Sequence, residues 1–123
     1  QTCALPISTT GTSFITTGFS VTITPSSVNS KILISYAIAA YNSGSATFIT
    51  IYRNGSNIGP ANGFTEQQGG YWNTTFHQYL DSPATTSATT YTVYVRTSNS
   101  GLAAIWGDSG GVGQVMILQE IAA

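Results

Sequence analysis

Charged residues are scarce in this sequence. They make up 6% of its 123 residues, where about a quarter is usual, and Lys31, Arg53 and Arg96 are the only strong bases. Three bases cannot neutralise a run of phosphates, so nucleic-acid binding is not expected. So little charge also removes the repulsion that keeps protein surfaces apart. We therefore expect much of the surface to be buried against other copies of the chain.

Cysteine and long apolar runs are scarce as well. Cys3 is the only cysteine, so no disulfide can form within the chain. A chain of 123 residues can nevertheless bury roughly two thirds of its unfolded surface, which is enough for one domain with its own core. No apolar stretch approaches the roughly 20 residues that span a bilayer, so membrane insertion is not predicted.

Residues for catalysis and metal binding are few and scattered. His77 is the only histidine, and the four acidic residues are widely separated. A catalytic histidine needs a nucleophile and an orienting acid, and a metal needs several converging ligands. Glu66 and Asp108 lie in long predicted loops, which leaves two alternatives: a weak glycan hydrolase or esterase using these acids and His77, and a calcium site near Asp108. The simpler interpretation is two solvated acids, so we predict no enzyme activity, no metal and no cofactor.

Hydroxyl residues and alternating patterns take the place of charge. Serine contributes 15 residues and threonine 19. Apolar and polar residues alternate with the period of two that predicts β-strands, and no helical pattern stands out. The predicted strands, mostly joined by short turns, cover residues 13–17, 19–24, 31–40, 46–53, 56–58, 71–80, 91–96, 102–106 and 114–121. This pattern predicts an all-β, antiparallel β-sandwich of the jelly-roll type over residues 13–121, after a linker at 1–12 whose end could join a sheet edge.

Three segments give the predicted sandwich its details. Residues 31–40 are apolar or small on both faces, which predicts a central strand covered on each side; a short helix is the alternative. Asn54-Gly55 is the strongest hairpin signal, because both residues tolerate the positive φ of a type I′ turn. Pro83 donates no amide, so it belongs in the connection before the strand whose apolar face is formed by Tyr91, Val93 and Val95.

Two long loops, at residues 59–70 and 98–113, are the candidates for ligand contacts, since long ordered loops often carry function. Exposed aromatic rings beside amides and carboxylates are suited to stack on sugars and bind their hydroxyls. The predicted ligand-contacting residues are Glu66, Gln67, Tyr71, Trp106 and Asp108. Alternation instead favours a place in the sandwich core for Trp72, and the same interpretation applies to Phe76.

Five segments, spread over residues 12–121, form a recognisable combination: Phe19-Ser-Val-Thr-Ile-Thr-Pro-Ser-Ser, Ser30-Lys-Ile-Leu-Ile, Tyr52-Arg-Asn-Gly, Tyr79-Leu-Asp-Ser-Pro-Ala-Thr-Thr-Ser-Ala-Thr-Thr-Tyr and Leu118-Gln-Glu-Ile. In this order they resemble a family of bacteriophage virion proteins, the C-terminal knob domains of tail fibres and related appendages. The resemblance implies a jelly roll similar to complement C1q and tumour-necrosis-factor domains. It also implies a homotrimer on a fibre and a location in the virion.

Tyrosine buries a large area while keeping a polar tip, which suits a subunit interface. The residues predicted to line that interface are Tyr36, Tyr52, His77, Tyr79 and Tyr94. We expect a non-enzymatic, trimeric fibre knob that contacts a host-surface glycan or protein through its loops, with three weak sites acting together. The alternative is a purely structural module, a capsid decoration or trimerisation element without a ligand.

Overall fold

The computed structural model describes residues 7–99, 103–105 and 114–123, which contain β-strands and no helix. This confirms the predicted all-β class and excludes a helix at residues 31–40. The strands are β1 (Ile7–Thr9), β2 (Ile15–Ile23), β3 (Lys31–Asn42), β4 (Ala46–Arg53), β5 (Ser56–Asn57), β6 (Thr65–Gln68), β7 (Asn73–Asp81), β8 (Thr89–Thr97), β9 (Ala103–Ile105) and β10 (Val115–Ile121).

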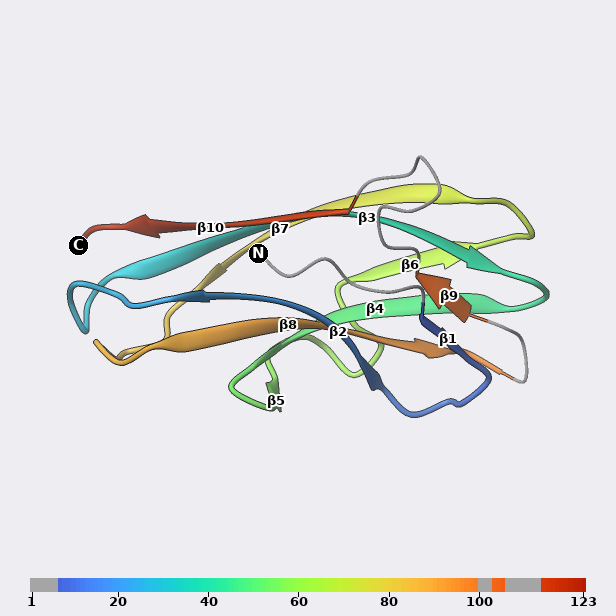
Figure 1. The fold of residues 1–123 in the computed structure, drawn as a ribbon, viewed down its shortest axis with the longest axis horizontal. Coiled ribbons are helices and arrows are strands. Elements are labelled where there is room, and N and C mark those ends of the chain that lie inside the picture. Colours follow the sequence, from blue (N-terminus) through green and yellow to red (C-terminus); the bar gives the residue numbers. More distant parts are fainter. Residues whose placement is uncertain (1–6, 100–102, 106–113) are drawn as a thin grey trace.

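Two antiparallel sheets of five strands each pack face to face, as the two layers of Figure 1 show. In sheet A, β3 pairs with β7 along one edge, and with β10 and then β9 along the other. The end of the predicted linker does join this sheet, because β1 pairs with β9. In sheet B, β8 lies between β2 and β4, and the far edge of β4 carries β5 and β6. The chain therefore forms the predicted β-sandwich.

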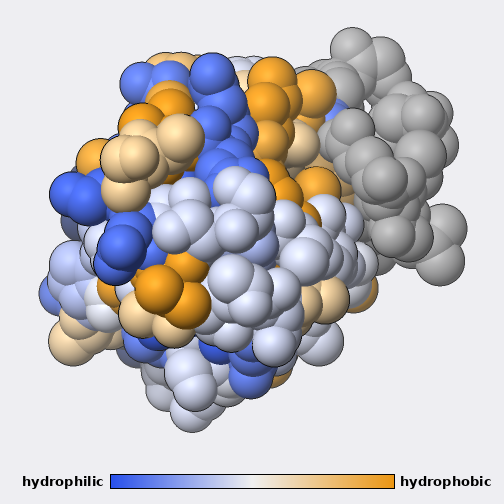
Figure 2. Space-filling model, turned by 90° about the vertical axis from the view of Figure 1, so that its left-hand side faces the viewer, coloured by the Kyte–Doolittle hydropathy of each residue, from blue (hydrophilic) through white to orange (hydrophobic). Residues whose placement is uncertain are grey.

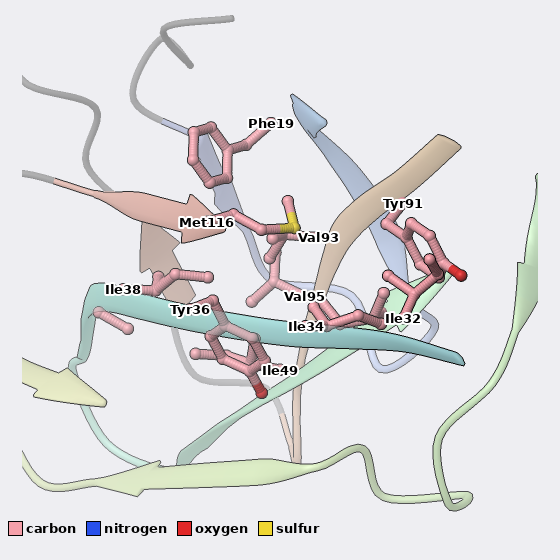
Figure 3. Packing of buried hydrophobic residues seen from close by; sticks show 12 residues of the cluster. Phe19, Ile32, Ile34, Tyr36, Ile38, Ile49, Tyr91, Val93, Val95 and Met116 are labelled. Atoms are coloured by element: carbon pink, nitrogen blue, oxygen red, sulfur yellow. The ribbon is translucent and has the colours of Figure 1, made fainter. Parts of the chain in front are cut away.

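The core lies between the two sheets and comes mainly from alternate residues of β3, β4 and β8 (Figure 3). Ile32, Ile34, Tyr36 and Ile38 of β3 are completely buried. Burial raises the pKa of the Tyr36 phenol to about 12, although a hydrogen bond to Thr65 partly offsets this effect. The remaining members of the buried cluster are Phe19, Ala40, Ile49, Ile51, Tyr91, Val93, Val95 and Met116.

A polar cluster joins the two sheets at one end of this core. Asp81, at the end of β7, is almost fully buried and accepts hydrogen bonds from Nη1 of Arg53 at 2.9 and 2.8 Å. The buried hydroxyl of Tyr91 donates to Oδ2 of the same carboxylate at 2.7 Å. Because Asp81 belongs to sheet A and its two partners to sheet B, the cluster fixes the position of one sheet relative to the other.

Asn54, Gly55 and Gly63 adopt a left-handed backbone in two of the connections. Asn54 and Gly55 have φ values of 48° and 87°, as the predicted type I′ turn between β4 and β5 demands. Gly63 has a φ of 83°, and a Cβ atom there would lie 2.5 Å from the carbonyl oxygen of Ile49. Gly63 therefore lets the segment between β5 and β6 run close against β4.

Four details differ from the sequence-based predictions. The strands predicted at residues 13–17 and 19–24 form one strand, β2. The predicted loop at residues 59–70 contains β6, which pairs with β4. The central strand β3 is covered on one face only, because Leu33, Ser35 and Ala37 on its other face are partly exposed. The predicted core residues Trp72 and Phe76 are exposed, and the alternate residues of β7 face the core instead.

Candidate functional site

The outer face of sheet A is rich in exposed apolar residues. The register places outward-facing residues of β7, β3 and β10 in three rows: Phe76–Ala37–Val115, Gln78–Ser35–Ile117 and Leu80–Leu33–Gln119. Phe76 is 64% exposed and Ile117 is 57% exposed, and Leu80 and Val115 are also exposed. Figure 2 shows hydrophobic residues, with hydrophilic ones between them, along the upper side of the molecule, where these three strands lie in Figure 1. We call these nine residues the sheet A face.

On the outer face of sheet B, the strand β4 is covered by its own chain. Phe48 and Thr50 point outward from β4 but are buried. The guanidinium of Arg96 lies 4.3 Å from the centre of the Phe48 ring and donates to the side chain of Asn62. Thr50 donates to Asn57, in the segment that folds back over this strand. The two sheets therefore differ: the outer side of β4 in sheet B is largely covered within the protomer, whereas large apolar residues stand exposed on the outer face of sheet A.

Loops meet at the end of the sandwich opposite the C-terminus, on the right of Figure 1. Here a shallow open hollow of about 500 Å³ lies where the β3–β4 turn, the end of β6 and the residue after β8 come together. Its lining residues are Gly44, Ser45, Ala46, Glu66, Gln68, Gly69 and Ser98. We call it the end hollow.

The predicted ligand-contacting residues fall into three groups. Glu66 lines the end hollow, and Tyr71, which follows two residues after Gly69, is 78% exposed. Gln67 is instead buried, and its amide donates to the carbonyl oxygens of Gln68 and Tyr71, so it organises the loop from within. The last two, Trp106 and Asp108, lie outside the described residues.

The five residues predicted at a subunit interface do not share one surface. Tyr36 is completely buried inside the protomer, so it has no surface to offer a neighbouring copy. Tyr52 and Tyr94 pack edge to face on the outer side of sheet B. His77 and Tyr79 line the core side of β7, where both rings contact the Phe64 ring.

His77 has aromatic rings as neighbours. The Phe64 ring is stacked on its imidazole with 5.2 Å between centroids, and the Tyr36 ring lies 5.8 Å away. Partial burial lowers the pKa of His77, because the charged imidazolium loses contact with water. This environment favours a neutral imidazole that packs between rings.

The described residues contain no group of three or more potential metal ligands. Nor does the described part of the chain include a helix long and apolar enough to cross a membrane.

No protein-family model matches the sequence, and no curated protein matches it.

Sequence reasoning identified the strands that form the sheet A face but not the face itself. Alternation grouped Val115 with Ile117 on one side of β10, and Phe76 with Leu80 on one side of β7. Phe76, Leu80, Val115 and Ile117 form one face because they stand beside outward residues of β3. That arrangement depends on the register of the strands, for which the sequence offered no signal.

Proposed function

We propose that this domain is a non-enzymatic virion component, the knob of a phage fibre or related appendage, which assembles as a homotrimer and attaches to a host-cell surface. The sheet A face is the observation that carries the proposal. A contiguous group of exposed apolar residues on a nearly uncharged domain is typical of a surface that another protein covers. The family resemblance of the sequence supports a second and a third copy of the chain as that protein.

Burial of the sheet A face would contribute free energy that favours association. Phe76, Leu80, Val115 and Ile117 each still expose roughly half of their surface. Full burial of such a side chain is worth about 1.5–3 kcal/mol, so the remaining half contributes roughly 1 kcal/mol for each residue in each copy. No charged side chain stands among the nine residues, so association pays no large desolvation cost.

Self-association would leave the loops at the end hollow free. They lie at the end of the sandwich, and not on the sheet A face. Three copies held rigidly would present three such ends together, and linked weak sites can bind about 100 to 10,000 times more tightly than one. A glycan or protein on the host surface is the proposed partner.

Adsorption of the labelled domain to a panel of bacterial strains tests the attachment. We expect the wild-type domain to bind at least one strain, and a variant that cannot assemble, Ile117→Glu, to bind that strain at least about a hundredfold more weakly. Val28→Glu is the matched control. Val28 is 55% exposed, nearly as much as Ile117, but it lies in the β2–β3 connection away from the sheet A face.

An assembled wild-type domain that binds no strain would favour the purely structural module instead. Turnover of a glycan or ester that is lost on substitution of Glu66 or His77 would contradict the non-enzymatic part of the proposal.

A further inference from the structure

The end hollow exists because small residues form its floor. Ala46 points outward from the start of β4, and Gly44 and Gly69 have no side chains. The next outward residue of β4, Phe48, is large and fills the same face under Arg96. The hollow of about 500 Å³ falls in the range of roughly 300–1,000 Å³ that small-molecule sites occupy.

Two buried amide side chains hold the walls of the end hollow in place. The Oδ1 atom of Asn42 accepts hydrogen bonds from the backbone of Gly44 and Ser45 and from the Ser45 hydroxyl. On the other side, the amide nitrogen of Gln67 donates to backbone oxygens of residues 68, 69 and 71. Both amides are almost completely buried. The walls are therefore formed before a ligand arrives, which lowers the entropic cost of binding.

The side chains that line the end hollow with hydrogen-bonding groups are one carboxylate, one amide and two hydroxyls. Glu66 offers a carboxylate, which accepts only, and it is oriented by a hydrogen bond from the Gln68 amide. Ser98 accepts from the backbone N–H of Ala46 at 2.9 Å and keeps its hydroxyl proton for another acceptor. All seven lining residues are described, and none of them is basic or bears a large apolar side chain.

This chemistry excludes two classes of ligand. An anion would meet the Glu66 carboxylate with no basic residue in the lining to pair with it. An apolar ligand would leave the polar walls without partners when it displaced water. A neutral polyhydroxyl ligand suits the site, because its hydroxyls can donate to the carboxylate and accept from the Ser98 hydroxyl and the Gln68 amide.

We propose that the end hollow binds one unit of a neutral saccharide, held by hydrogen bonds to Glu66, Gln68 and Ser98. The inference rests on the proposed attachment function and assigns to it a site and a ligand class. Tyr71, two residues after Gly69 in the chain, is exposed but does not line the hollow, so the inference does not depend on it. Such a single site is expected to be weak, with a Kd on the order of millimolar, and to act through its three copies.

Titration of the isotopically labelled domain with neutral hexoses and N-acetylhexosamines, followed through its amide NMR signals, tests the site. At sugar concentrations up to about 100 mM, which would reveal even a millimolar site, we expect the signals of Gly44, Ala46 and Gly69 to shift. Glu66→Gln keeps the shape and removes the charge, and it should weaken binding about tenfold, because hydrogen bonds to charged acceptors are stronger. Glu120→Gln makes the same change of charge near the opposite end of β3 and should leave binding unchanged.

Three outcomes would overturn the inference: no shift with any neutral sugar, equal binding by Glu66→Gln, or shifts confined to another surface. Binding of glucosamine that disappears in high salt while glucose does not bind would assign the hollow to a cationic ligand and would also overturn it. If the Glu66→Gln variant adsorbs to cells as strongly as the wild-type domain, this site is rejected and the attachment function still stands. If the wild-type domain itself adsorbs to no strain, the attachment function is rejected.

Discussion

Removal of the Asp81 carboxylate should destabilise the fold in a way that a second substitution partly repairs. In Asp81→Ala, the buried Tyr91 hydroxyl loses its acceptor, and the Arg53 guanidinium loses its paired charge. An unsatisfied buried hydroxyl costs about 1–3 kcal/mol, and breaking a buried ion pair costs about 3–5 kcal/mol. The Arg53 side chain is 31% exposed and can regain water, so we take the low end and expect a loss of roughly 3 kcal/mol.

Tyr91→Phe separates the two contributions. Alone, it removes one hydrogen bond and leaves Asp81 paired with Arg53, which should cost about 1 kcal/mol. Added to Asp81→Ala, it removes the hydroxyl that has become unsatisfied. The double variant should therefore be about 1 kcal/mol more stable than Asp81→Ala, although each substitution destabilises the protein by itself.

Urea unfolding followed by circular dichroism measures all four proteins of this cycle, at one protein concentration because assembly makes stability depend on concentration. The structure predicts a coupling energy of roughly 2 kcal/mol between the two positions. Additive losses, with the double variant about 4 kcal/mol below the wild type, would refute the idea that Asp81 is the acceptor on which Tyr91 depends.

Two further predictions concern pH and backbone conformation. Because burial lowers the pKa of His77, the unfolded chain binds a proton at this residue more readily than the folded chain as pH falls toward about 6.5. The stability of the fold should therefore decrease from about pH 7.5 to 5.5. In thermal melts, His77→Gln should make stability depend less on pH over this range, and an unchanged dependence would contradict the assignment. Gly55→Ala, with open space around its Cβ, should lose only the about 1–2 kcal/mol of stability that left-handed strain costs. Gly63→Ala should lose well over this amount, because its Cβ would also meet the Ile49 backbone. Equal losses of stability in urea unfolding would contradict the close approach at Gly63.

Much of the fold could be predicted from the sequence because local patterns determine it. Strict alternation located Tyr91, Val93 and Val95, and the left-handed tolerance of Asn54 and Gly55 located the hairpin turn. The strand β6 could not be predicted in this way. Its residues, Thr65–Gln68, include no apolar side chain, and it is a strand because the edge of β4 offers it backbone partners.

The surfaces were harder to predict than the strands, because the choice of inner face is made by the register. β7 has aromatic residues on both faces, with Phe76 on one and His77 and Tyr79 on the other. Pairing with β3 places His77 beside the inward-facing Tyr36, so the face with the more apolar residues points outward. A prediction that put the most apolar face in the core was therefore wrong for this strand, and that reversal is what creates the sheet A face.

The mass of the assembly in solution tests the central claim most directly. By size-exclusion chromatography with light scattering at micromolar concentration, the wild-type domain and its Val28→Glu variant should both show three times the 12.9 kDa of one chain. Ile117→Glu should show the mass of a single chain while keeping its β-sheet circular dichroism. A wild-type domain that runs as a single chain, or an Ile117→Glu variant that assembles as well as Val28→Glu, would contradict association through the sheet A face.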